Sequence, residues 1–263
     1  MKKMLICIFA AVLAVSMVGC KGDVGSGSGE GGGSGYIGSK APDEAKAVGD
    51  IVFSDGSATP YAAGLTLTDN QKSKSIAVIY KVDGDKVYGV GMAHKLGIKW
   101  CKDTANGLNY NFLGIQCTPL QESSGEISFS GDTDGSNNFT YIGWDLGTGD
   151  DTNYEGMYPA FEFAKNYKDD ELSRVKGSIY EEGWYLPTIS ELYDIWKVKA
   201  TVNAAYDLCK PYQPVNYKFG AYYWSSSQRA SNSKYAYYMD FFSNGPAYND
   251  KNTSADVCCI RVF

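Results

Sequence analysis

The chain contains almost no histidine and has no excess of basic residues. One of its 263 residues is histidine, which leaves little material for histidine-based acid–base catalysis or zinc binding. Lys and Arg number 24 against 30 Asp and Glu, giving a net charge of −6, so we expect no nucleic-acid partner. Gly-x-Ser-x-Gly, P-loop and His-x-x-x-His patterns are all missing. The sequence therefore predicts a protein that is not an enzyme.

Long hydrophobic runs are also missing. The longest run, Met4–Val18, is too short to span a bilayer comfortably and follows Lys2 and Lys3, as in a secretory signal peptide. The last residues of this segment, "MVGC", resemble a bacterial lipobox, which implies cleavage before Cys20 and lipidation of its thiol. The alternative is an ordinary signal peptide with an incidental cysteine.

A Gly/Ser-rich stretch without apolar periodicity follows the cysteine, and such segments behave as flexible coils. We therefore predict a signal peptide at 1–19, a lipidated cysteine with its tether at 20–47, and one domain at 48–263. The predicted location is the bacterial outer membrane, at the cell surface, and the lipid anchor is the sole predicted membrane contact.

Five cysteines remain after the signal peptide and the lipidated residue: Cys101, Cys117, Cys209, Cys258 and Cys259. Because the number is odd, at least one thiol stays free or pairs between molecules. Three alternatives are open: a Cys101–Cys117 bridge across a hairpin, a bridge from Cys209 to one of the adjacent pair, or buried free thiols.

Several segments carry clear local signals. Two β-rich runs, Ile76–Val82 and Lys86–Met92, flank Asp83-Gly84-Asp85 and predict a hairpin, and we expect His94 to be a surface or hairpin residue. A capping box of Thr188 and Glu191 predicts a helix start. Further helical patterns begin after Pro159 and Thr201. The residues expected on the inner helix faces are Phe161, Ala164, Leu192, Ile195, Trp196, Val202, Ala205, Tyr206 and Cys209.

The remaining segments are rich in turn-forming residues. Residues 131–156 are rich in Gly, Asn and Asp, and we expect long exposed loops there. Tyr237–Phe242 alternates as a strand. We expect it to pair with a final strand that starts near Val257, through a long polar loop after Pro246. Tyr, Ser and Asn make up 17 of the 35 residues from Tyr222 to Asp256, which is the composition of adaptable binding surfaces.

The segments "GWYLPTISELYDIW", "YYWSSSQ", "YAYYMDFFSNG" and "VCCIRVF" resemble a known family. They are similar to bacterial surface lipoproteins with a C-type-lectin-type fold of the formylglycine-generating-enzyme (sulfatase-modifying factor) group. The resemblance covers residues 48–263, most firmly 183–263, and is closest to variable proteins of diversity-generating retroelements. It implies an α+β fold, two main helices around twisted antiparallel sheets, and a variable ligand-binding segment at 222–263.

The resemblance and the alternation together divide this segment into two sets. Trp224, Ser225, Ser226, Tyr237, Met239, Phe241, Gly245 and Arg261 are predicted to be scaffold. The predicted contacts to a protein or glycan ligand are Arg229, Asn232, Lys234, Tyr235, Tyr238, Asp240, Phe242, Tyr248, Asp250, Asn252 and Asp256. Solvated strand and loop residues without a ligand are the simpler alternative.

The sequence leaves two other functions and one metal ion as alternatives. The family's enzyme uses a cysteine pair near the C-terminus with copper, whereas Cys258 and Cys259 are adjacent and no base accompanies them. A purely structural envelope lipoprotein also fits the sequence. No cofactor is predicted, although a structural calcium ion at the oxygen-rich segments around Asp132–Asn138 and Asp150–Glu155 is an open alternative.

Overall fold

The computed structural model describes residues 35–145, 156–210, 218–242 and 245–263. The chain separates into two units, Met1–Gly33 and Ser34–Phe263, and the second unit holds every described residue. No helix in the described ranges is both long and apolar enough to cross a membrane.

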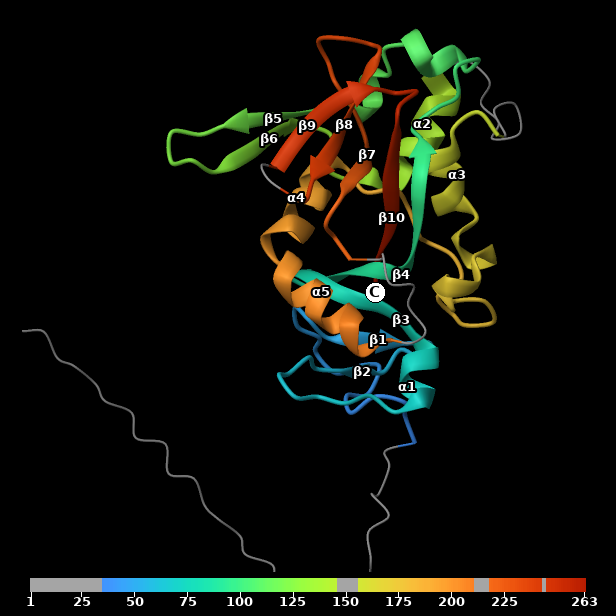
Figure 1. The fold of residues 1–263 in the computed structure, drawn as a ribbon, viewed down its shortest axis with the longest axis vertical. Coiled ribbons are helices and arrows are strands. Elements are labelled where there is room, and N and C mark those ends of the chain that lie inside the picture. The colour runs from blue at the N-terminus through green and yellow to red at the C-terminus, as the bar shows by residue number, and fades with distance from the viewer. Residues whose placement is uncertain (1–34, 146–155, 211–217, 243–244) are drawn as a thin grey trace, which may run out of the picture. The chain divides into compact units, whose positions relative to one another are not determined.

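Most of the described unit is organised around one mixed, eight-stranded sheet (Figure 1). Its strand order is β2-β1-β3-β4-β10-β7-β8-β9, and β5 with β6 forms a separate hairpin. Neighbouring strands are antiparallel except β10 and β7, which run parallel through Asp256 and Tyr223. The strands are β1 (Ile51–Phe53), β2 (Ala58–Thr59), β3 (Ser75–Asp83), β4 (Lys86–Lys99), β5 (Cys117–Gln121), β6 (Ile127–Gly131), β7 (Tyr222–Gln228), β8 (Tyr235–Asp240), β9 (Gly245–Asp250) and β10 (Ser254–Val262).

Helices cover the sheet from both sides, so the domain has two hydrophobic cores (Figure 1). One core includes Phe161 and Trp224, and the other includes Leu192 and Met239. The five helices of the described ranges are α1 (Asp69–Lys74), α2 (Asn138–Asp145), α3 (Pro159–Lys165), α4 (Ile189–Lys197) and α5 (Lys199–Leu208). The predicted α+β class is thus confirmed at the level of a large sheet with few helices, while the lectin-type detail stays a prediction.

Local signals in the sequence locate the first hairpin and the helices correctly. Gly84 has a φ of +58°, which the tight turn between β3 and β4 requires. Thr188 Oγ1 accepts the Glu191 amide hydrogen, and the Glu191 carboxylate accepts the Thr188 amide hydrogen, so the predicted capping box exists. The predicted inner-face residues of α3, α4 and α5 are buried, except Trp196, which is half-buried.

The three serines of "YYWSSSQ" are fully buried and join separate elements. Ser225 Oγ donates to the Tyr237 carbonyl oxygen over 2.7 Å. Ser226 Oγ accepts from Asn138 Nδ2 over 2.7 Å, and Ser227 Oγ accepts the Ile189 amide hydrogen over 3.0 Å. Buried hydroxyls need such partners, so these serines hold β7 against β8, α2 and α4.

The predicted pairing of the last strands is wrong. The segment after Pro246, predicted as a loop, is strand β9, and it pairs with β8. The last strand lies instead between β4 and β7, with its longest pairing to β4. The β4–β10 pair brings together residues that are far apart in the sequence, and no local pattern announces such a pairing.

Three other expectations have mixed outcomes. His94 belongs to the second strand of the hairpin, because β4 continues past Met92 to Lys99, but it is completely buried rather than on the surface, and its side chain packs between Tyr206 and Tyr223. All five cysteines from Cys101 onward are free and buried, which is the third of the alternatives, and neither suggested disulfide is present. Part of the loop expected at 131–156 is helix α2, and residues 146–155, including Asp150 and Glu155, lie outside the described residues.

Candidate functional site

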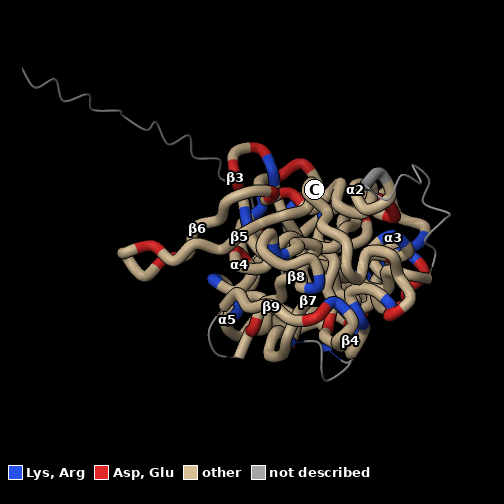
Figure 2. The backbone as a smooth tube through the Cα atoms, turned by 90° about the horizontal axis from the view of Figure 1, so that it is seen from above, with Lys and Arg blue, Asp and Glu red and all other residues tan. Residues whose placement is uncertain are grey.

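The strands β7, β8 and β9 form the end of the sheet, and their two faces differ in cover. Helix α4 packs against all three strands on one face, where Met239 and Tyr237 join its core. On the other face, which we call the open face, Tyr222 is 50% exposed, whereas Trp224 beside it is buried in the core that contains Phe161. Figure 2 looks onto this end of the domain, where charged residues of both signs are interspersed along mainly uncharged strands.

Strand register places four side chains of β7 and β8 together on the open face. Tyr222 lies opposite Asp240, and Trp224 lies opposite Tyr238. On the neighbouring strand β9, small residues stand opposite two of them: Gly245 faces Asp240 and Ala247 faces Tyr238. Because glycine and alanine are short, they leave Tyr238 and Asp240 uncovered from that side.

A groove of about 270 Å³ follows from this arrangement. We call it the aromatic groove, and its lining residues are Tyr222, Trp224, Tyr238, Asn249, Thr253, Ser254 and Ala255. The Tyr238 ring meets the Tyr222 ring at 5.4 Å and 82°, and the Trp224 ring at 5.9 Å and 86°. Trp224 is buried and donates its Nε1 hydrogen to the Ile98 carbonyl oxygen over 3.2 Å, which fixes the groove floor.

Asp240 is positioned beside these rings by its own turn. Its Oδ1 accepts the Phe242 amide hydrogen over 2.8 Å. Burial, followed by the charges of Asp240 and Tyr222, raises the pKa of the Tyr238 hydroxyl. The groove therefore combines aromatic walls with uncharged hydrogen-bonding side chains, and the Asp240 carboxylate lies beside it, opposite Tyr222.

A second aromatic group lies on the opposite face of the same strands. The Arg229 guanidinium stacks 3.7 Å from the Tyr248 ring centroid and 5.9 Å from that of Tyr235. Tyr235 and Tyr248 contact each other at 5.4 Å, while Asp250 is the partner of Tyr235 in the ladder. This surface already holds a cation of its own.

None of the eleven predicted contact residues is buried. Lys234, Phe242 and Tyr248 are exposed, Phe242 at 75%, and the other eight are half-buried. The structure does not gather them on one face: Tyr238 and Asp240 belong to the open face, whereas Arg229, Tyr235 and Tyr248 belong to the opposite one.

Three of the remaining contact residues take part in local structure. Asn232 Oδ1 accepts the Lys234 amide hydrogen over 3.0 Å, and the Asp256 carboxylate accepts the Gly97 amide hydrogen over 2.9 Å. The Asn252 side chain hydrogen-bonds to Asp103. The Asn232 bond orders the turn before β8, the Asn252 bond ties the β9–β10 turn to Asp103, and the Asp256 bond joins β10 to β4.

Five groove residues were missed from the sequence, namely Tyr222, Asn249, Thr253, Ser254 and Ala255, and Trp224 was predicted to be scaffold. Alternation would place Tyr222 and Trp224 on the same face, and that signal was available. Asn249 could be placed in the groove only if the segment after Pro246 was recognised as a strand. Ser254 could be placed there only from the position of β10 beside β7.

Two buried polar side chains support the groove from beneath. Lys251 is completely buried in the turn between β9 and β10, and its Nζ donates to the carbonyl oxygens of Gly107 at 2.7 Å and Tyr110 at 3.1 Å. Gln228 at the end of β7 donates to the same Tyr110 oxygen over 2.8 Å and accepts the Phe112 amide hydrogen over 2.7 Å. The segment that begins at η1 (Asn106–Asn109) is thus held between β7 and the β9–β10 turn.

The adjacent cysteines are poorly suited to thiolate chemistry. Cys258 and Cys259 are both fully buried, and burial raises the pKa of both thiols far above the ordinary value. Within the described residues, no group of three or more His, Cys, Asp or Glu side chains could hold a metal ion. Asp132 in the segment weighed for calcium accepts a hydrogen bond from Asn138 Nδ2.

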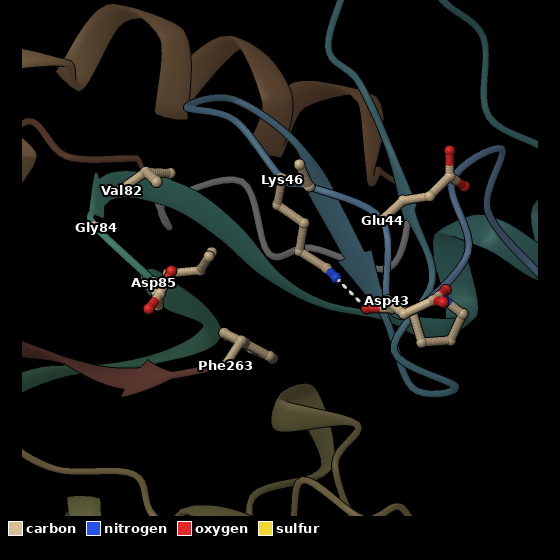
Figure 3. A pocket seen from close by; sticks show the side chains of 10 residues that line it. Asp43, Glu44, Lys46, Val82, Gly84, Asp85 and Phe263 are labelled. Atoms are coloured by element: carbon tan, nitrogen blue, oxygen red, sulfur yellow. Dashed lines mark hydrogen bonds between the residues drawn. The ribbon is translucent and has the colours of Figure 1, made fainter.

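A larger cleft of about 390 Å³ lies at the β3–β4 turn, among residues 42–46, 82–87 and Phe263 (Figure 3). Lys46 donates to the Pro42 carbonyl oxygen over 2.7 Å, and burial lowers its pKa. Glu44 points away from the hollow in Figure 3 and accepts the Ala41 amide hydrogen. Lys46 and Glu44 therefore bond within their own loop, and we do not assign the cleft a ligand.

The fold and the groove together define a mixed α+β domain that presents an aromatic strand surface at one end of its sheet. The family model of the Lcl C-terminal domain matches residues 95–261, and the chain belongs to this family. That match contains every strand of the groove.

Two further comparisons bear on the fold. A solved structure described as a fimbrial protein from Bacteroides ovatus ATCC 8483 is similar, with a TM-score of 0.54 and 15% sequence identity. The similarity covers 83% of this chain and 49% of that one, so this chain spans about half the length of the fimbrial protein. A search of curated protein sequences finds no match.

Proposed function

We propose that this protein is a surface-displayed, non-catalytic lipoprotein that binds a ligand through the aromatic groove. The single observation that carries the proposal is an ordered groove lined by aromatic side chains on the sheet face opposite helix α4. Large rigid tyrosines with Ser, Thr and Asn at the rim make a binding surface at low entropic cost. The Lcl family match and the fimbrial neighbour support a surface location.

The finer assignments belong to the same proposal. Residues 1–19 act as a signal peptide, Cys20 carries the lipid, and residues 20–47 tether a C-type-lectin-type domain to the outer membrane. Nucleic acid and cofactors have no role, and the membrane is contacted through the anchor. The buried, protonated thiols at Cys258 and Cys259 are the observation against the cysteine-dependent enzyme alternative.

The proposal predicts that Tyr222→Ala/Tyr238→Ala removes binding. On an array of purified proteins and glycans, we expect the binding signal of this full-length variant to be more than about tenfold weaker than that of the wild type, because stacked aromatic contacts dominate such surfaces. Tyr36→Ala, an exposed aromatic at 47% that lies outside the groove lining, is the matched control and should bind normally. Unchanged binding of the double variant to every panel member would disprove the function.

Diversification of the binding segment makes a separate prediction. The fixed set should be the buried residues such as Trp224 and Met239, and the varied set the exposed ones such as Tyr222 and Tyr248. We expect a near-identical template copy of the gene's 3′ end beside a reverse transcriptase gene, with differences confined to adenines. Sequencing the flanking DNA tests this, and a flank without such a template removes diversification from the proposal.

A further inference from the structure

The chain repeatedly places a cation of its own over an aromatic ring. Arg229 stacks 3.7 Å from Tyr248, Lys197 lies 5.3 Å from Tyr193, and Lys81 lies 5.5 Å from Tyr88. Aromatic faces attract cations through the ring quadrupole, most strongly where water is excluded. These contacts show that rings of this domain are accessible to cationic side chains.

The aromatic groove is the exception. Among the described residues, no Lys or Arg side chain lies over the rings of Tyr222, Trp224 or Tyr238. The nearest lysine in the sheet register, Lys99 opposite Ser254, pairs with Asp103 at 3.0 Å. The rings of the groove are therefore available to a cation from another molecule.

The charge beside the groove has the sign that suits a cationic guest. Asp240 stands directly opposite Tyr222 on the open face, held by the Phe242 amide. The rim adds the hydroxyl oxygens of Thr253 and Ser254, which can accept hydrogen bonds. The chain as a whole carries a net charge of −6. A guest with positive charge gains from each of these groups, whereas a neutral guest gains from the rings and rim alone.

The size of the groove limits the guest to one side chain. Its volume of about 270 Å³ lies below the range of roughly 300–1,000 Å³ that is usual for sites of drug-sized ligands. An aromatic wall with a carboxylate at one end matches a long side chain with a terminal cation, because the alkyl stem packs on the rings and the charge reaches the acid.

We propose that the aromatic groove accepts an Arg or Lys side chain of a protein partner, with Tyr222, Tyr238 and Asp240 as the recognising residues. The inference rests on the proposed ligand-binding function and narrows it to one class of ligand. Arginine fits best, because its planar guanidinium stacks on rings and donates to several acceptors at once.

The test uses beads coated densely with short peptides that differ at one central residue: arginine, lysine, citrulline or norleucine. Citrulline keeps the shape of arginine and removes its charge. We expect the full-length chain to be retained by arginine and lysine beads and about tenfold less by citrulline beads, which lack the charge that the rings attract. Asp240→Asn should reduce arginine retention and leave citrulline retention unchanged.

The outcomes distinguish a failure of the cationic guest from a failure of the proposed ligand-binding function. Equal retention by arginine and citrulline beads, or no retention by arginine beads, overturns the cationic guest. The cationic guest is also overturned if the chain is retained through Tyr222 and Tyr238 by beads coated with a neutral oligosaccharide or with the chain itself. In that case the binding function stands. If Tyr222→Ala/Tyr238→Ala leaves retention by every kind of bead unchanged, both the cationic guest and the proposed binding function are overturned. Asp240→Asn is expected to keep the wild-type unfolding midpoint, which shows that any loss is not misfolding.

Discussion

Replacing Lys251 with alanine is expected to destabilise the domain by about 3 kcal/mol, because a buried carbonyl loses its shorter hydrogen bond and a cavity forms. The Gly107 carbonyl oxygen accepts from Lys251 Nζ at 2.7 Å and keeps only the longer bond from the Tyr110 amide, at 3.3 Å. The Tyr110 oxygen is less affected, since Gln228 also donates to it. Chemical denaturation of the two proteins measures the difference.

Lysine at this position also gives the stability a characteristic pH dependence. Burial lowers the pKa of the Lys251 ammonium from 10.5 to about 7. Above pH 7 the folded chain holds a neutral amine, while the unfolded chain stays protonated up to about pH 10.5. Unfolding then takes up a proton, so this residue makes the domain more stable as pH rises, by up to roughly 1.4 kcal/mol per pH unit.

Lys251→Met is the matched control, because methionine keeps much of the apolar stem and cannot titrate. The stability of the wild-type chain relative to this variant should grow between pH 7 and 9. The cysteines ionise in both unfolded chains alike, so their effect cancels in the difference. Parallel pH profiles for the two chains would show that the amine does not change its protonation on folding.

Lys251 also illustrates what the sequence does not reveal. It sits between Asp250 and Asn252 in a polar segment, where a lysine is ordinarily a solvated residue. Its burial depends on contacts to Gly107 and Tyr110, more than a hundred residues away. The β3–β4 hairpin and the Thr188 capping box, by contrast, were predicted because all their determinants lie within a few residues.

In the candidate site, too, the features set by neighbouring residues were predicted and those set by distant contacts were not. Alternation correctly separates buried Tyr237 and Met239 from half-buried Tyr238 and Asp240, since it needs a strand and nothing more. Whether a displayed residue lies on an open or a covered face depends on which helix packs there. That is why the predicted contacts mix Tyr238 of the open face with Tyr248 of the other.

The buried titrating groups oppose one another below pH 7. Burial raises the pKa of Glu191 to about 7, so its contribution to stability falls as pH rises from about 4.5 to 7. His94 acts in the opposite direction, because burial lowers its pKa from 6.5 to about 3. The unfolded chain binds a proton that the folded one does not, so stability is lost as pH falls from 6.5 toward 3.

Between about pH 4.5 and 6.5 the two contributions nearly cancel, and below that the histidine acts alone. From these two residues we therefore expect a flat stability profile between about pH 4.5 and 6.5, and a loss of up to roughly 1.4 kcal/mol per pH unit below pH 4.5 from the histidine. Other carboxylates add to the acid loss, so a variant is needed to isolate the histidine.

His94→Gln supplies that variant, since glutamine can still hydrogen-bond to the hydroxyls of Tyr206 and Tyr223 but cannot titrate. In the wild type Tyr206 donates to the Gly91 carbonyl oxygen, which leaves its oxygen to accept from Nε2, and Nδ1 then accepts from Tyr223 at 2.9 Å. Protonating Nδ1 would force the Tyr223 hydroxyl to turn away. We expect wild type to lose stability faster than the variant as pH falls below 6.5. Because the untagged chain has a single histidine, its imidazole proton resonance reports this group alone. A native resonance that titrates near pH 6.5 would contradict the depressed pKa.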